Sequence, residues 1–216
     1  EFFNKDEYFS GDWVEVLDAA NKVVATGHFQ HGSIMVRILS YQTVASPIEV
    51  YANKIQNAFE LRKKLSLTDN PHTTVYRLIH GEGDGLPGLV IDVYNELVVI
   101  ETHSYGMYAD RHLIAQVVQQ VFAHVKAIYC IAEHEEGVLP EYLMGTMQQP
   151  LLVCENEKKF LVNCESGQKT GFFIDQRENR KLLAQYVENK KVLNTFCYTG
   201  GFSVYALHAG AALVHS

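Results

Sequence analysis

The sequence lacks the short signatures of several large enzyme classes. None of its four cysteines forms a CxxC pair, which argues against a structural zinc site. The dinucleotide fingerprint GxGxxG, the phosphate-binding loop GxxxxGKS/T and the GxSxG elbow are also absent. These absences argue against nicotinamide oxidoreductases, phosphate-loop nucleotide hydrolases and serine hydrolases.

Long apolar runs and a secretory leader are missing as well. No stretch approaches the roughly 18 apolar residues of a membrane span. The first residues, EFFNKDEYFSGDW, show no basic start followed by an apolar core. We therefore expect a cytoplasmic protein with reduced thiols and no membrane contact. Because residue 1 is not Met, we expect the 216 residues to be part of a longer protein, cut at both ends.

The overall composition is that of a globular protein, with 47% hydrophobic and 20% charged residues. The net charge of −7 argues mildly against a protein coated in nucleic acid. Residues 151–191 nevertheless carry more Lys and Arg than Asp and Glu. A local positive face is one interpretation of this segment, and scattered solvated charge is the other.

Hydrophobic periodicity predicts alternating β and α segments as far as residue 165. Short apolar–polar runs rich in Val and Ile predict three strands within 12–40, and SPIEVYANKIQNAFELRKKL predicts a helix capped at Ser46 with Pro47 in its first turn. Ile48, Ala52, Ile55, Phe59 and, more loosely, Leu65 recur at helical spacing and predict its buried face. The later expectations are strands within 74–102, a helix over MYADRHLIAQVVQQVFAHV, a strand at KAIYCIA and a hairpin turning near Asn156 and Glu157.

The pattern changes from about residue 166. FFIDQRENRKLLAQYVEN predicts a helix capped by Asp175, with Glu178 at the capping-box spacing and Leu182, Leu183 and Tyr186 on its buried face. KVLNTF, a glycine turn, FSVYALHAG and ALVHS then predict strand, turn, helix and strand. This order is typical of the first unit of a doubly wound parallel sheet.

The glycine turn NTFCYTGGFS is the strongest candidate for a binding site. Gly200 and Gly201 lie where a strand passes into a helix, so a ligand can approach the backbone closely. The turn offers few amides for a diphosphate, which favours an adenosine cofactor without phosphates, namely S-adenosylmethionine. A purely structural turn is the alternative.

A second candidate is GQKTGFFIDQRENR at 167–180. One of its phenylalanines could contact the adenine or methionine part of the cofactor, and Gln176 or Arg177 its polar groups. The alternative is an ordinary helix start with a core phenylalanine. Two acidic stretches are weaker candidates for a functional site. RLIHGEGDGLPG is expected to be a structural hairpin, and AEHEEGV at 132–138 is expected to be a solvated loop rather than a metal site.

Four stretches together carry a family resemblance: GHFQHGSIMVRILS, RLIHGEGDGLPGLVIDVY, KTGFFIDQRENR and VLNTFCYTGGFSVYALHAGA. In this order and spacing, the chain resembles the PUA-domain-containing S-adenosylmethionine-dependent 23S rRNA cytosine-5 methyltransferases of the large-subunit methyltransferase I type. The resemblance implies a multi-domain α+β and α/β protein. A partial RNA-binding PUA β-barrel is expected over 1–44, a central α+β domain over 45–165, and the first strand–helix–strand unit of a class I methyltransferase Rossmann-like fold over 166–216.

The resemblance also implies a site and its partners. S-adenosylmethionine is the expected cofactor, ribosomal RNA the expected partner, and a homodimer is left open. The ribose-binding acid and the catalytic cysteine are expected beyond Ser216, so this chain alone is expected to be inactive. Cys197 lies in the cofactor turn and is rejected as the nucleophile. The alternative is an RNA-binding module with a vestigial Rossmann-like portion. The expected cofactor residues are Lys169, Phe173, Gln176, Arg177, Phe196, Tyr198, Thr199, Gly200 and Gly201.

Overall fold

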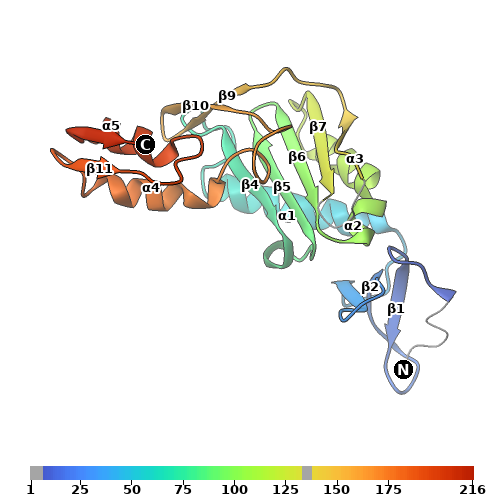
Figure 1. Cartoon of the computed structure of the whole chain (residues 1–216). Helices are drawn as coiled ribbons and strands as arrows, with labels where there is room; N and C mark the ends of the chain where they lie inside the picture. The colour runs from blue at the N-terminus through green and yellow to red at the C-terminus, as the bar shows by residue number, and fades with distance from the viewer. Residues whose placement is uncertain (1–6, 133–137) are drawn as a thin grey trace. The chain divides into compact units, whose positions relative to one another are not determined.

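The structure, a computed structural model, describes residues 7–132 and 138–216 (Figure 1). These residues form two compact units, one within Glu1–Thr68 and Arg77–Met147 and the other within Asp69–Tyr76 and Gln148–Ser216. The domain boundaries expected at 44/45 and 165/166 stay a prediction. Most of AEHEEGV, residues 133–137, lies outside the described residues.

The first unit begins with a small antiparallel sheet, as the sequence predicted. Its strands β1 (Trp13–Leu17), β2 (Val23–Phe29) and β3 (Val36–Ser40) pair in the order β1-β2-β3. Asn21, with a φ of 59°, lies in the turn between β1 and β2, where its short polar side chain tolerates the left-handed region. The pairing sets Trp13 opposite His28 across the two strands.

A larger mixed sheet follows, with the strand order β4-β5-β6-β7-β8. The strands β5 and β6 are antiparallel and buried along their whole lengths, while β6 and β7 run parallel. The helices α2 and α3 make the crossover between β6 and β7, and the sequence pattern did not predict β8. The bounds are β4 (Val75–His80), η2 (Gly81–Asp84), β5 (Leu89–Tyr94), β6 (Leu97–Thr102), α2 (Tyr105–Ala109), α3 (Arg111–Val121), β7 (Ala127–Ala132) and β8 (Glu141–Met144).

The helix α1 (Pro47–Lys64) forms where it was predicted, with Ser46 at its N-cap. Ser46 makes no side-chain cap hydrogen bond, so this detail of the expectation is wrong. The buried stripe is also rotated from the expected one. Helices α1 and α3 contact each other and lie on the same face of the β4–β8 sheet (Figure 1). The buried residues of α1 are Tyr51, Ile55 and Ala58.

A buried polar cluster ties the small sheet to the helices of the same unit. One carboxylate oxygen, Oδ2 of Asp110, accepts hydrogen bonds from Nε1 of Trp13 at 2.8 Å and Oη of Tyr51 at 2.7 Å. Nε2 of His28 lies 3.1 Å from the same oxygen. The helix α2 can approach because Gly106 lacks a side chain: a Cβ there would lie 2.1 Å from Nδ1 of His28. Four segments distant in sequence therefore meet at one oxygen.

The second unit contains a hairpin and the strand–helix–strand segment. The hairpin turns at Asn156 and Glu157, whose φ angles of 49° and 68° are those of a tight two-residue turn. The strands β11 and β12 pair in parallel on either side of α5, as the sequence predicted. The bounds are β9 (Leu151–Glu155), β10 (Lys158–Val162), η3 (Ile174–Gln176), α4 (Arg177–Ala184), β11 (Lys191–Leu193), α5 (Gly201–His208) and β12 (Leu213–His215).

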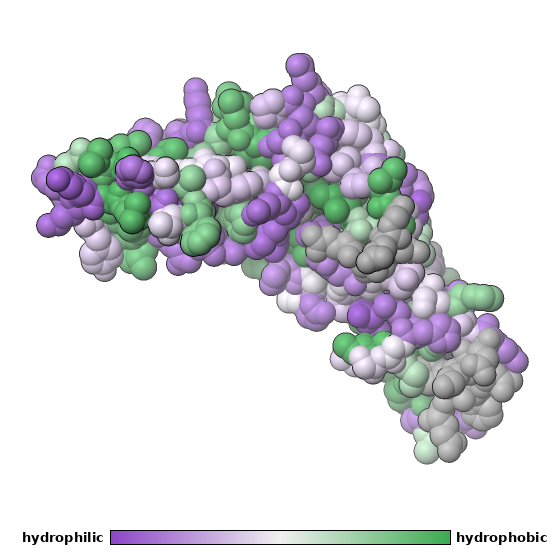
Figure 2. All heavy atoms as spheres, in the orientation of Figure 1, coloured by the Kyte–Doolittle hydropathy of each residue, from purple (hydrophilic) through white to green (hydrophobic). Residues whose placement is uncertain are grey.

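The start of α4 differs from the expectation. A 3-10 turn occupies 174–176, so the N-cap is Gln176 and the predicted capping box of Asp175 and Glu178 is wrong. Leu182 and Tyr186 are exposed by 51% and 69% rather than buried. The buried residue of α4 is the charged Arg180, because its ionic partner lies in the interior of the same unit. Figure 2 shows hydrophobic surface over this unit. Its exposed large apolar residues include Leu193, Phe196, Leu207 and Leu213.

Candidate functional site

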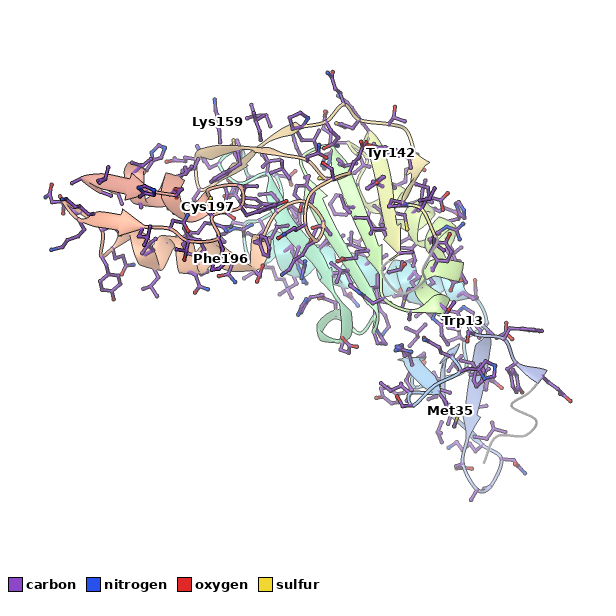
Figure 3. All side chains as sticks on the ribbon, in the orientation of Figure 1. Trp13, Met35, Tyr142, Lys159, Phe196 and Cys197 are labelled. Atoms are coloured by element: carbon purple, nitrogen blue, oxygen red, sulfur yellow. The ribbon has the colours of Figure 1, made fainter. Side chains whose placement is uncertain are left out.

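A pocket of about 340 Å³ opens at the glycine turn of the second unit. One wall is the segment between β11 and α5, on which Phe196 and Cys197 lie (Figure 3). The other wall comes from the loop before α4 and the first turns of that helix. The volume is within the range of small-molecule sites, roughly 300–1,000 Å³. The lining residues are Lys169, Phe173, Asp175, Gln176, Arg180, Phe196, Cys197, Tyr198, Thr199, Gly201 and Phe202.

The glycine-turn wall holds its backbone in a sparsely populated region. Phe196, Tyr198 and Gly200 have φ angles of 57°, 48° and 71°. Only glycine adopts this region without cost, and a bulky residue there is an outlier. Phe196 is moreover fully solvent-exposed, at 101% of its reference area. Backbone strain and an exposed aromatic side chain are both features that concentrate at binding sites.

Tyr198 connects the two walls of the pocket. Its ring packs edge-on against Phe173, with 5.4 Å between centroids and 85° between planes. Its hydroxyl accepts a hydrogen bond from the amide of Gln168 at 2.9 Å and donates to the carbonyl of Gly171 at 3.2 Å. Gly167 makes room for this hydroxyl, because a Cβ there would lie 2.7 Å from it. The pocket is therefore preformed by contacts within the protein.

A buried ion pair underlies the pocket. Arg180 donates from Nε and Nη2 to the two carboxylate oxygens of Glu155, both at 2.8 Å, and Glu155 is fully buried. Nη2 also donates to the carbonyl of Phe173 at 3.0 Å. A bidentate pair of this kind fixes the guanidinium in one plane. The hairpin, α4 and a wall residue of the pocket are thus held by one side chain.

Tyr205 of α5 completes this network. Its hydroxyl donates to Oε1 of Glu155 at 3.0 Å and accepts from Nδ2 of Asn156 at 2.7 Å. Burial, together with the nearby charge of Glu155, raises the pKa of Tyr205 to about 12. The phenol therefore stays protonated at neutral pH and acts as a donor. It connects α5, whose first turn lines the pocket, to the same carboxylate that holds Arg180.

The pocket brings together seven of the nine residues expected from sequence, all but Arg177 and Gly200. Arg177 turns away: its guanidinium donates to the carbonyl of Val75 and lies 3.4 Å from Glu155. Gly200 supports the turn by its left-handed backbone instead. Sequence reasoning missed four lining residues, and it had chosen the earlier of two arginines three residues apart on α4. The missed residues are Asp175, Arg180, Cys197 and Phe202.

The other candidate stretches take structural roles. Asp84 receives a bidentate pair from Arg62 at 2.6 and 2.8 Å and accepts from the amide of His80, which makes RLIHGEGDG the structural turn that was expected. Residues 7–132 and 138–216 contain no cluster of three or more His, Cys, Asp or Glu that could hold a metal. None of the helices in these ranges is long and apolar enough to cross a membrane.

Comparison with protein families agrees with this geometry. Residues 99–216 match the profile of a family described as S-adenosylmethionine-dependent methyltransferase, and residues 2–41 match a PUA-like domain. The first match contains the whole pocket lining. The second covers the three strands of the small N-terminal sheet, and the two matches together confirm the expected fold class.

Individual relatives carry related names. The chain is 36% identical over 214 residues to ribosomal RNA large subunit methyltransferase I of Pseudoalteromonas atlantica, and 36% over 211 residues to that of Aeromonas hydrophila. These alignments cover 95% and 93% of this chain but 53% and 52% of the relatives, so the chain spans about half their length. A SAM-dependent methyltransferase structure from Streptococcus mutans superposes with a TM-score of 0.83 at 26% identity, covering 95% of this chain and 54% of that one. A second structure with the same TM-score is a methyltransferase complexed with SAH.

Proposed function

Because the chain belongs to the family of S-adenosylmethionine-dependent methyltransferases, we propose that it forms the cofactor pocket and RNA-binding module of an rRNA methyltransferase. The proposed reaction moves a methyl group from S-adenosylmethionine to C5 of a cytosine in 23S rRNA. The observation that carries the proposal is the preformed pocket between the glycine turn and the loop before α4. The PUA-like match and the rRNA methyltransferase names of the relatives support the choice of substrate.

The pocket suits S-adenosylmethionine in chemistry as well as in size. When bound, this cofactor supplies an electrophilic methyl group on sulfur. Phe173 and Phe196 offer apolar faces to its adenosine or thioether parts, and Lys169, Asp175 and Arg180 offer charges to its zwitterionic end. The turn has no phosphate-binding signature, which fits a nucleoside without phosphates. The role of these side chains is to bind and orient the cofactor.

RNA contact is proposed for the PUA-like sheet and for exposed basic residues. Lys63 and Lys64 are exposed at the end of α1 and free to neutralise phosphates. Arg62, in the same turn of α1, is held by Asp84 and by the carbonyl of Arg77. Arg37 of β3 is likewise engaged, by Gln30 at 2.7 Å. Lys63 and Lys64 are therefore more available to phosphates than Arg62, whose charge is paired with Asp84. Arg37 keeps its charge because Gln30 is neutral.

Methylation of C5 also needs a thiolate that adds to the base, and none of the four cysteines lies in a suitable place. Cys130 and Cys164 are buried, and burial raises the pKa of the Cys130 thiol to about 12. Cys197 lines the cofactor pocket itself, and Cys154 lies on the hairpin. A thiolate must attack the base from outside the cofactor site. We therefore propose that the 216-residue chain binds cofactor and RNA but does not turn over.

Two binding experiments test the proposal. Isothermal titration of the chain with SAH should show one site, and fluorescence anisotropy with 23S rRNA segments should show binding that weakens as salt rises. RNA binding without SAH binding would favour the alternative, an RNA-binding module with a vestigial Rossmann-like portion. Robust transfer of tritiated methyl groups to 23S rRNA by this chain alone would refute the assignment of the missing nucleophile.

Two further expectations belong to the same proposal. The four cysteines are free thiols, which suits a cytoplasmic enzyme acting on ribosomal RNA. A homodimer stays a prediction, and sedimentation of the chain over a range of concentrations would test it.

A further inference from the structure

Arg180 is a buried cation on the border of the pocket. Its side chain is 3% exposed, yet it is one of the lining residues. Its three hydrogen bonds use only Nε and Nη2, to Glu155 and to the carbonyl of Phe173. The structure gives Nη1 no hydrogen-bond partner within residues 7–132 and 138–216. Nη1 is not among the buried polar atoms that lack a partner, so it is open to solvent, and a ligand in the pocket can accept its hydrogens.

The unused donor faces the glycine turn. Nη1 lies 3.4 Å, and Cδ 3.2 Å, from the position that a Cβ on Gly201 would occupy. The plane of the guanidinium is fixed by the bidentate pair with Glu155 and by the ring of Phe172, whose centroid is 4.7 Å from Cζ. The direction of the Nη1 hydrogens is therefore set before any ligand arrives.

This arrangement suits a carboxylate. A guanidinium donates in a rigid fork to planar oxyanions, and Gly201 begins α5, whose positive end favours the same charge. The other cation of the pocket, Lys169, is half-exposed and lies 3.8 Å from Asp175. Asp175 offers the opposite charge, suited to an ammonium group. The pocket thus presents groups for both charges of an amino acid.

We propose that Nη1 of Arg180 binds the carboxylate at the amino-acid end of S-adenosylmethionine, and that Glu155 positions Arg180 for this contact. The inference rests on the proposed function, because it names the part of the cofactor that this pocket receives. It also assigns Arg177, which was expected from sequence, to the support of Glu155 and of the chain at Val75.

A thermodynamic cycle between protein and ligand tests the contact. Affinities for SAH and for decarboxylated SAH, which differ only in the carboxylate, are measured by titration of the wild-type chain and of Arg180→Lys. Lysine keeps a cation beside Glu155, so the buried carboxylate still has an ionic partner. A lysine ammonium lacks the planar guanidinium, so it cannot bind Glu155 and the ligand carboxylate at the same time. Removing the carboxylate should weaken binding to the wild-type chain about tenfold or more, and binding to Arg180→Lys less than about threefold.

The comparison of two ligands on one preparation is independent of how much of a variant is folded. Lys181→Met is the matched control, because it removes an exposed cation of α4 that does not line the pocket and should leave the carboxylate effect within about threefold of wild type. If wild type binds both ligands equally, or if Arg180→Lys keeps the wild-type ratio, the inference is wrong and the proposed function stands. If the wild-type chain binds neither ligand, the proposed function itself fails.

Discussion

Replacing Asp110 with Asn should destabilise the first unit, because one carboxylate oxygen holds three donors from separate segments. Oδ2 accepts from Trp13 and Tyr51 at 2.8 and 2.7 Å, and His28 lies 3.1 Å away. Nδ1 of His28 is buried and has no partner among the described residues, and the ring donates to Asp110 from Nε2. Asn keeps the shape of the side chain but removes the charge from all three bonds.

The magnitude follows from the difference between charged and neutral acceptors. A hydrogen bond to a charged group contributes roughly 1.5–3 kcal/mol and one to a neutral group roughly 0.5–1.5 kcal/mol, so three bonds lose about 3 kcal/mol. The Asp110 side chain is 19% exposed, and solvent screening reduces the loss to about 2 kcal/mol. Tyr51→Phe should cost about 1 kcal/mol by itself, and the double variant should show a coupling of about 1 kcal/mol.

The chain contains its own probe for this measurement. Trp13 is its single tryptophan and donates to the oxygen in question, so urea unfolding followed by tryptophan fluorescence reports on this cluster. Glu60→Gln, which removes an exposed carboxylate from α1, is the charge-matched control and should stay within about 0.5 kcal/mol of wild type. An Asp110→Asn variant as stable as this control, or single variants that add without coupling, would refute the reasoning.

The remaining predictions concern pH, the glycine turn and the thiols. Burial raises the pKa of Asp110, but the hydrogen bonds from His28, Tyr51 and Trp13 outweigh burial and lower the pKa on balance. The stabilisation by the Asp110 carboxylate is therefore present above the unfolded pKa of about 3.9 and is lost as pH falls through the folded pKa. The gap in unfolding free energy between wild type and Asp110→Asn should therefore shrink below about pH 4; a constant gap contradicts the shift. Gly200→Ala should lower the unfolding free energy of the second unit by about 1–2 kcal/mol in chemical denaturation. The cause is the left-handed φ alone, since no atom lies within 4 Å of the new Cβ. An unchanged denaturation midpoint would show that the turn is not strained. SAH should slow alkylation of Cys197 but not of Cys154, which is also half-buried but lies outside the pocket; peptide mass spectrometry checks this, and equal protection would place the ligand elsewhere.

Helices, strands and turns that depend on residues close together in the sequence were predicted well. The helix α1 follows from Pro47 and an apolar spacing, the hairpin from two turn residues at 156–157, and the β11–α5–β12 unit from a glycine turn between two apolar strands. Errors arose where a distant partner overrides a local preference. Asp175 has the spacing of a capping residue, yet a 3-10 turn precedes α4 and leaves it uncapped. The stripe of α1 is rotated because packing, not spacing alone, selects the buried residues.

The sequence by itself determined the class of protein and seven of the eleven residues that line the pocket. One contiguous stretch contains Gly200, Gly201 and the aromatic residues beside them. The absence of phosphate-binding signatures argues against a ligand with a diphosphate. Only the tertiary structure decided which arginine borders the pocket. Arg177 and Arg180 are equivalent in a helical pattern, and they are distinguished by Glu155, which lies on a hairpin 25 residues before Arg180. The buried carboxylate of Glu155 forms its bidentate pair with the arginine that the packing of α4 against the hairpin brings within reach. The spacing of residues along α4 does not contain that information.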